Sequence, residues 1–275
     1  SPLRSFQTTL RVPTPPAQPP PSGSVVFHLR GVPDDPFTAA ANHHAGVDAL
    51  LQLMGRSGLK FHRSAASGDT SGPSGLIAAG DVVLLKVSAQ WKYRGCTNSD
   101  VVRGLVQRIL EHPDGYTGEV VIVENGQGRG SLRCDTSSSY GGDTSVRANA
   151  NDESHSFVYL VEQIFRDRRV SATLLDPIRS TFIGADDHST NGYRRIQNVS
   201  YPCFNTAGGR RVELLEGVWT GAQHERHLKL LNVPVLKHHD TGGSEITGAV
   251  KHFYGLVSMS DGGAAARHYS ALGET

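Results

Sequence analysis

Two uninterrupted apolar runs on either side of one amphipathic helical pattern constrain the fold of this 275-residue chain most strongly. Val82–Val87 has the sequence VVLLKV, and residues 119–123 have the sequence EVVIV. Such runs are typical of strands that are buried on both faces of a parallel sheet. Between them, residues 98–110 carry apolar side chains at helical spacing, and Ser99 is placed to cap that helix. The segment therefore predicts a βαβ unit.

Further segments extend the same pattern along the chain. We expect helices over residues 42–54, 155–166 and 245–257, and strands over residues 25–30, 172–175, 211–215 and 228–233. Residues 68–75, 126–152 and 186–195 are rich in glycine and polar residues and predict loops. The sequence thus predicts an α/β fold with a mostly parallel, doubly wound sheet that is flanked by helices and has long loops.

The N-terminal residues predict a tether in front of one domain. Residues 11–23 contain six prolines, which favour an extended polyproline II conformation and exclude a helix. We expect residues 1–23 to form a Pro-rich tether and residues 24–275 to form a single α/β domain. The chain begins at Ser1, which indicates a removed leader or a trimmed end. A tether after a processed end suits an exported protein, periplasmic or extracellular, and it offers a segment for self-association. The alternative is an ordinary linker.

Charge and cysteine content exclude several classes of protein. Lys and Arg number 27 against 26 Asp and Glu, so the net charge of +1 argues against a dedicated nucleic-acid binder. No apolar stretch has the roughly 18 residues that a membrane span needs. The three cysteines, Cys96, Cys134 and Cys203, form no CxxC pair, which excludes a zinc knuckle or an iron–sulfur motif. One disulfide with a free thiol and three reduced thiols both remain open.

Reactive side chains follow the predicted strands where each strand ends. Lys86 lies near the end of one buried run, Glu124 follows the next, and Asp176 follows residues 172–175. Lys237 comes a few residues after the strand at 228–233. Because ligands bind beyond the carboxyl ends of parallel strands, we expect these side chains to share one site. The alternative is the ordinary meeting of strand ends with polar loops.

Two segments that contain candidate residues have patterns suited to binding anions. Lys86 is surrounded by apolar residues, so its ammonium group must pair with a carboxylate or lose its proton. Lys86 would then serve as a ligand anchor or as a base, and the alternative is a structural ion pair. Gly243 and Ser244 open the predicted helix at 245–257, where free backbone N–H groups favour an anion. Lys251 would add its charge there. The alternative is an ordinary serine-capped helix.

Adjacent histidines offer metal-ligand chemistry. His238, His239 and Asp240 form such a group, and His252, His43 and His44 could join them, although no recognised metal-ligand spacing links these residues. His224 and His227 lack the interval of an HExxH motif, but they would share a face if that stretch were helical. The alternative is a set of solvated or hydrogen-bonded histidines.

The motif NVPVLKHHDTGGSEITGAVKHFYG, within residues 228–259, resembles the signature of the bacterial domain-of-unknown-function family three-six-two. GDVVLLKVSAQW, at residues 80–91, resembles that family's "GD.VLIKPN" motif. The resemblance covers roughly residues 25–259 and implies an α/β fold, frequent export and no settled reaction. It assigns recurrent polar positions to Lys86, Lys237, His239 and Lys251. His252 stands where the family pattern has asparagine, and the ferredoxin-like cysteine clusters of many members are missing here.

Two functional hypotheses follow. In the first, the protein handles a small anionic ligand, a carboxylate or a phosphate, with catalysis left open. Lys86, Lys237 and Lys251 would hold the anion, and His239 would act as general acid or base, oriented by Glu124 or Asp176. A divalent metal at His238, His239 and Asp240 is an optional cofactor. In the second, the protein is an exported binding or assembly module without catalysis, and its lysines form structural ion pairs.

Overall fold

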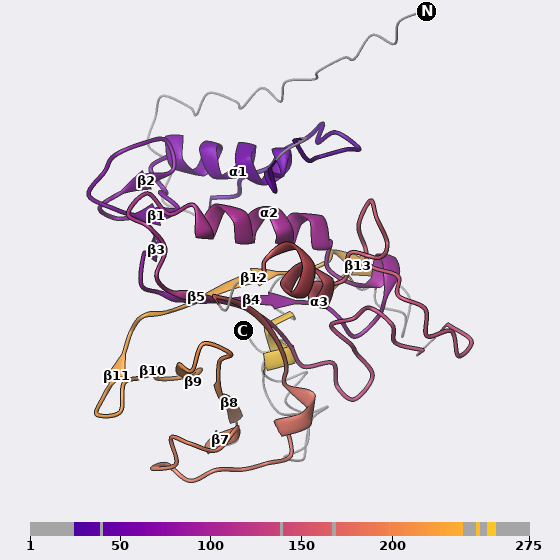
Figure 1. The fold of residues 1–275 in the computed structure, drawn as a ribbon, viewed down its shortest axis with the longest axis vertical. Coiled ribbons are helices and arrows are strands. Elements are labelled where there is room, and N and C mark those ends of the chain that lie inside the picture. Colours follow the sequence, from indigo (N-terminus) through magenta and orange to yellow (C-terminus); the bar gives the residue numbers. More distant parts are fainter. Residues whose placement is uncertain are drawn as a thin grey trace, which may run out of the picture. The chain divides into compact units, whose positions relative to one another are not determined.

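The structure, a computed structural model, describes residues 25–38, 41–137, 140–166, 169–197, 199–238, 246–247 and 252–256 (Figure 1). The chain divides into two compact units. The first consists of Ser1–Ala79 and Arg103–Tyr116, and the second consists of Gly80–Val102 and Thr117–Thr275.

The first unit combines helix α1 (Ala45–Arg56) with a small parallel sheet in the order β2-β1-β3. Its strands are β1 (His62–Arg63), β2 (Ser71–Gly72) and β3 (Ile77–Ala78). His44 caps α1, because its Nδ1 accepts hydrogen bonds from the backbone N–H groups of the first turn, at 3.1 and 3.2 Å. The helix therefore starts three residues later than predicted.

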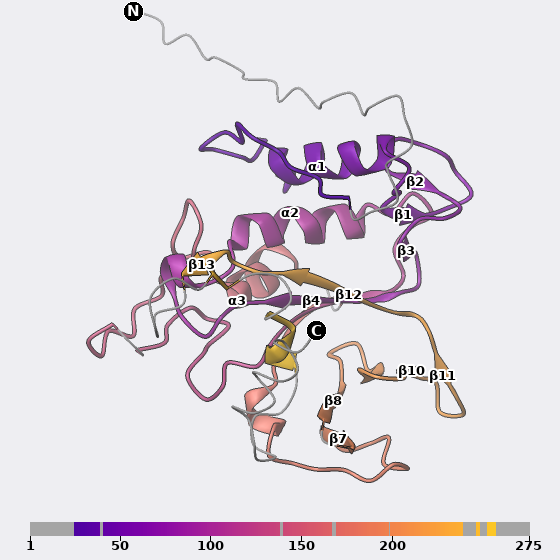
Figure 2. The same ribbon diagram turned by 180° about the vertical axis from the view of Figure 1, so that it is seen from behind.

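The second unit is built on a parallel sheet in the order β12-β4-β5-β6 (Figure 2). The strands are β4 (Val82–Val87), β5 (Glu119–Glu124), β6 (Val170–Leu174) and β12 (Leu228–Val233). Every residue of β4 and β5 is buried, which is why these two strands carry continuous apolar runs. In register, Lys86 of β4 lies opposite Asn232 of β12 and Val123 of β5.

An antiparallel sheet, in the order β11-β10-β9-β8-β7, packs on one face of the parallel sheet. Its strands are β7 (Gly192–Ile196), β8 (Val199–Asn205), β9 (Arg211–Glu213), β10 (Gly217–Trp219) and β11 (His224–Glu225). Phe204, Val212 and Val218 of this sheet share a buried cluster with Leu84 and Val123 of the parallel sheet. The two sheets thus form a continuous apolar core below β4 and β5.

The remaining elements are short, apart from α2 (Ser99–Leu110), which begins in the second unit and continues into the first. Helix α3 (Phe157–Tyr159) runs directly into the π-helical turn η2 (Leu160–Ile164). Strands β13 (Lys237–His238) and β14 (Ile246–Thr247) pair antiparallel. The other short turns are η1 (Tyr93–Gly95), η3 (Asp176–Ile178) and η4 (Phe253–Leu256). Within the described part of the chain, no helix has the length and apolar character to cross a membrane.

The predicted α/β class is confirmed, with a parallel sheet and an additional antiparallel one. Four local predictions are wrong. Residues 25–30 form no strand, and Val26 is 85% exposed, so it has no sheet to pack on. The predicted loop at 186–195 includes part of β7. Where the structure describes residues 245–257, they form β14 and η4 in place of one helix. Asn98, not Ser99, caps α2, because Asn98 Oδ1 accepts from the N–H of Val101 at 3.0 Å.

Candidate functional site

Lys86 lies at the carboxyl end of β4 with its ammonium group inside the protein. The residue is 1% exposed, although the strand around it is apolar. Its partner in register is Asn232, the last polar residue of β12. Parallel partners project from the same face of a sheet, so Lys86 and Asn232 continue the face on which Leu84 and Leu230 pack in the apolar core. The polar site therefore begins where this core ends.

All three N–H bonds of Lys86 are satisfied. Its Nζ donates to Glu124 Oε1 at 3.0 Å, to the carbonyl oxygen of Val87 at 2.7 Å and to His252 Nε2 at 3.1 Å. An ammonium group has three donors, so none remains for a further partner in this arrangement. The prediction that Lys86 meets a carboxylate is confirmed, and the carboxylate is the predicted Glu124.

Glu124, the last residue of β5, is 4% exposed. Its Oε2 accepts a hydrogen bond from the backbone N–H of Ala89 at 2.8 Å. Burial raises the pKa of Glu124, while the charge of Lys86 opposes that rise. Burial lowers the pKa of Lys86, and the charge of Glu124 opposes that fall. The two pKa values therefore move toward each other, which makes proton exchange between the groups easier than in water.

His252 covers Lys86 from a distant part of the sequence. Because its Nε2 accepts from the ammonium, its Nδ1 carries the proton and donates to Asn232 Oδ1. Burial, together with the positive charge of Lys86, lowers the pKa of His252 to about 3, so the ring is neutral near pH 7. Gly255 lies equally close: a Cβ there would be 3.0 Å from Lys86 Nζ.

Lys237, on β13, supplies a second cation beside this cluster. Among the described residues its Nζ donates one hydrogen bond, to the carbonyl oxygen of Gly95 at 3.2 Å. Burial lowers the pKa of Lys237, and the charges of Glu124 and Lys86 act on it in opposite directions. Unlike Lys86, the residue is partly exposed. It is thus the described lysine of this site with solvent access.

Asp176 begins η3 just beyond β6, as predicted, but its hydrogen bonds hold a loop. Its Oδ2 accepts from the backbone N–H of Gly128 at 2.8 Å, and Arg179 lies 3.6 Å from its Oδ1. Asp176 therefore stabilises the turn after β5, and within the described residues its polar contacts are with Gly128 and Arg179 and not with Lys86 or His252. The predicted role of Asp176 in orienting a histidine gains no support from these contacts.

The remaining predicted site residues lie outside the described residues: His239, Asp240, Gly243, Ser244 and Lys251. For His238, the backbone is described but the side chain is not. Sequence reasoning missed Asn232 and considered His252 only as a further metal ligand. A signal for Asn232 is its place two residues after Leu230, where period-two alternation puts a polar group on a core-facing position. No local signal links His252 to Lys86, because 166 positions separate them.

All three cysteines are free and buried, so the reduced alternative describes this structure. The backbone N–H of Asn149 contacts Cys96 Sγ at 3.4 Å. A hydrogen bond from Cys134 lowers the pKa of Cys96, and the positive charge of Lys237 adds to that effect. The same hydrogen bond and burial raise the pKa of Cys134. Cys96 therefore belongs to the surroundings of Lys237.

Comparisons with family models, with curated proteins and with solved structures find no match to this chain.

Proposed function

We propose that the protein binds a small anion, a carboxylate or a phosphate, at the carboxyl edge of the β12-β4-β5-β6 sheet. The observation that carries this proposal is the gathering of Lys86, Glu124 and His252 beside the more exposed Lys237. Lys237 is the group that meets the anion, because it is partly exposed and donates only one hydrogen bond among the described residues. A cation at the carboxyl edge of a parallel sheet lies where such sheets bind their ligands.

The buried cluster supports an acid–base role behind Lys237. Burial moves the pKa values of Lys86 and Glu124 toward each other, so passing a proton between them costs less than it would in water. His252 remains neutral and accepts from Lys86, which holds the ammonium in place. Groups with such shifts are typical of sites that transfer protons. We therefore favour an enzyme that acts on the bound anion, with Lys86 and Glu124 as the proton-exchanging pair.

The test is binding of inorganic phosphate, acetate and malonate to the full chain, measured by calorimetry at low ionic strength. Lys237→Met should weaken the binding of the preferred anion by at least about tenfold, the loss of one charge-assisted hydrogen bond. Lys60→Met is the matched control, because Lys60 belongs to the first unit and its Nζ donates to the carbonyl oxygen of Gly68 at 2.8 Å. Equal binding by both variants, or no binding of any of the three anions, would contradict the proposal.

One observation favours a second function, an exported binding or assembly module without catalysis. All three donors of Lys86 are occupied by protein atoms, as expected for a structural ion pair. With this second function we also propose that the protein is bacterial, is exported and self-associates through residues 1–23. Its resemblance to family three-six-two is likewise kept as a proposal. Light scattering on the full chain and on a chain that begins at residue 24 distinguishes the two. Assembly that depends on residues 1–23 would favour the module.

A further inference from the structure

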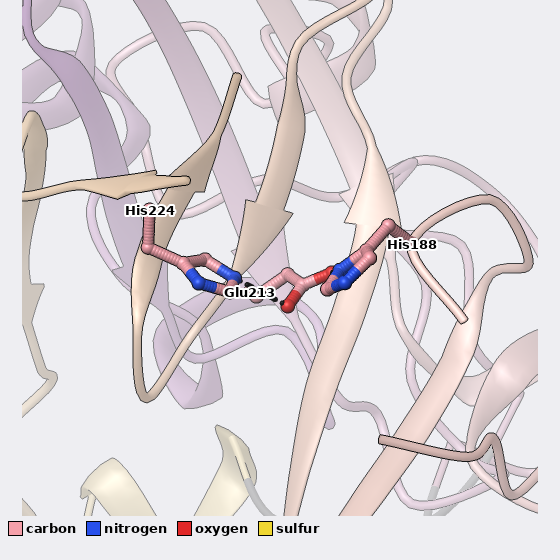
Figure 3. Close-up of side chains that lie close together, drawn as sticks. All are labelled: His188, Glu213 and His224. Carbon is pink, nitrogen blue, oxygen red and sulfur yellow. Dashed lines mark hydrogen bonds and ion pairs between the residues drawn. The ribbon is translucent and has the colours of Figure 1, made fainter. Parts of the chain in front are cut away.

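A second polar cluster lies in the second unit, on the antiparallel sheet (Figure 3). Val212 and Val218 point into the core beneath the parallel sheet. Side chains alternate along a strand, so Glu213 of β9 lies on the other face, and Trp219 of β10 and its register partner His224 share it. His188, from the loop before β7, joins them there. The fold thus brings two imidazoles and a carboxylate from three separate segments to one place.

The three side chains have the spacing of metal ligands. One ligand atom from each of His188, Glu213 and His224 lies within 4.8 Å of the other two. His188 Nδ1 is 2.8 Å from Glu213 Oε1, and His224 Nε2 is 2.7 Å from Glu213 Oε2. Around a tetrahedral zinc ion with bonds of ~2.1 Å, neighbouring ligand atoms are ~3.4 Å apart. The two contacts to Glu213 are ~0.6–0.7 Å shorter than this spacing, so each imidazole must move away from Glu213 by about that distance to admit an ion.

The surroundings hold these ligands in place. Trp219 stacks on the His188 ring, with centroids 3.8 Å apart and planes 11° apart. Arg194 Nη1 and Arg211 Nε donate to the two oxygens of Glu213, at 2.7 and 3.1 Å. In metal sites, neighbouring groups usually hold the ligating carboxylates by hydrogen bonds and fix the orientation of the ligating imidazoles. Burial opposes ionisation of Glu213, but hydrogen bonds from His188 and His224 and from the two arginines outweigh it and lower its pKa to about 2.

The charge of the two arginines does not exclude a cation. Glu213 and Glu216 offset Arg194 and Arg211, because Glu216 Oε2 also contacts Arg194 and lies 3.4 Å from His224 Nε2. The charged side chains around the two imidazoles therefore balance. When an ion binds the ring nitrogen that faces Glu213, the proton on that nitrogen moves to the other ring nitrogen or to solvent, which needs no oxidant or reductant.

His224 also lines a groove beside the cluster. This hollow of about 630 Å³ includes Glu216, and Arg226 and Lys229 add positive charge to it. Glu213 itself is buried. An ion held by three protein ligands keeps a fourth tetrahedral position, as catalytic zinc sites do, and His224 is the ligand that connects the cluster to the groove. The cationic lining suits an anionic group bound at that position.

We propose that His188, Glu213 and His224 bind a divalent transition-metal ion, with zinc the expected ion, and leave one coordination position open to the Arg226–Lys229 groove. Two imidazoles and one carboxylate form a donor set that zinc accepts and that magnesium and calcium do not prefer. None of these three ligands belongs to the predicted group His238, His239 and Asp240.

The experiment is a calorimetric titration of the full, chelator-treated chain with Zn²⁺, and with Mg²⁺ for comparison. We expect one Zn²⁺ per chain and no Mg²⁺ binding at the same concentrations. His188→Gln and His224→Gln should each weaken Zn²⁺ binding by about 100-fold or more. His227→Gln is the matched control. His227 comes shortly after β11 in the sequence, its side chain is 54% exposed, and it contacts Asp81 instead of Glu213.

A second readout locates the ion. Co²⁺ bound at this cluster should quench the fluorescence of Trp219, which stacks on His188, and should show the absorption bands of low-coordinate cobalt. Both signals should disappear in His188→Gln and persist in His227→Gln. Circular dichroism and thermal unfolding verify that each variant folds, and His224→Gln replaces His188→Gln if the latter does not. The proposal is overturned if the folded wild-type chain binds no Zn²⁺, or if binding survives in both cluster variants.

Discussion

Replacing His252 with asparagine should remove a specific pH dependence of stability. The ring is buried and neutral, with a pKa of about 3 against an ordinary value near 6.5. The folded-state pKa is the lower one, so the unfolded chain binds an additional proton between pH 6.5 and pH 3. Titration of His252 therefore adds no pH dependence to the free energy of unfolding above pH 6.5. Below pH 6.5 it makes the free energy of unfolding fall as the pH drops. Asparagine does not titrate, so His252→Asn should lack this fall.

The magnitude follows from the shift. Each pH unit between the two pKa values changes the free energy of unfolding by about 1.4 kcal/mol. Lowering the pH from 7 to 5 crosses roughly 1.5 units below 6.5, so His252 should cost the wild-type chain about 2 kcal/mol at pH 5 relative to pH 7. Glu213 does not add to this interval, because its pKa is lowered to about 2 from an ordinary value near 4.5.

The assay is urea unfolding at pH 7 and pH 5, followed by tryptophan fluorescence. Trp91 and Trp219 both belong to the second unit, which also contains His252. The pH-dependent loss of stability should be about 2 kcal/mol smaller in His252→Asn than in the wild type. His227→Asn removes an exposed histidine from the same unit and should keep the wild-type loss. An unchanged loss in His252→Asn would refute the assignment of a buried, neutral ring.

Three other predictions concern stability. Lys86→Met should cost about 3–5 kcal/mol in urea unfolding, because it leaves Glu124 buried without its cation, and the double variant with Glu124→Leu should recover most of that loss. A small cost in the single variant would contradict the buried pair. Gly130→Ala should lower the melting temperature, since its Cβ would lie 2.5 Å from a backbone carbonyl oxygen; Gly184→Ala, with open space around it, should not. Acid unfolding should depend on Glu213: its lowered pKa stabilises the fold above pH 4.5, this stabilisation is lost as the pH falls toward 2, and Glu213→Gln should lack that part of the loss.

The parallel sheet and its ion pair could be predicted because local pattern and burial agree there. β4 and β5 are buried on both faces, so their sequences are continuously apolar and each polar exception is informative. Lys86 is such an exception, and Glu124 ends the neighbouring strand. Parallel register then places the two ends side by side, which is why the strand-end argument found the pair.

The antiparallel sheet could not be predicted from sequence patterns in the same way. Three of its strands are short, and the outer faces of its strands are polar. β9, β10 and β11 have two or three residues each, too few to establish an alternation. Glu213 lies within the strand predicted at residues 211–215, but no sequence pattern places His224 beside it. Only the pairing of β9 and β11 with β10 puts them on one face beside Trp219. The spacing of His224 and His227 pointed to a shared helical face, but the structure gives the two rings different carboxylates.

The position of residues 252–256 depends on contacts that no local pattern contains. The apolar residues near the C-terminus predict a helix, yet η4 is a short turn that puts Leu256 into the core between the sheets. His252 and Gly255 then lie against Lys86. The close approach of Gly255 explains why a residue without a side chain occupies that position.

This arrangement orders the two lysines of the candidate site. Glu124 and the carbonyl oxygen of Val87 belong to the sheet itself, so the replaceable partner of Lys86 is the neutral ring of His252. An anion that bound Lys86 directly would have to displace that ring and separate residues 252–256 from the core. An anion that binds Lys237 requires no such change, because Lys237 keeps only Gly95 among its described partners. Under the proposed function, the ligand would therefore contact Lys237 first, and the packing of His252 would limit its access to Lys86.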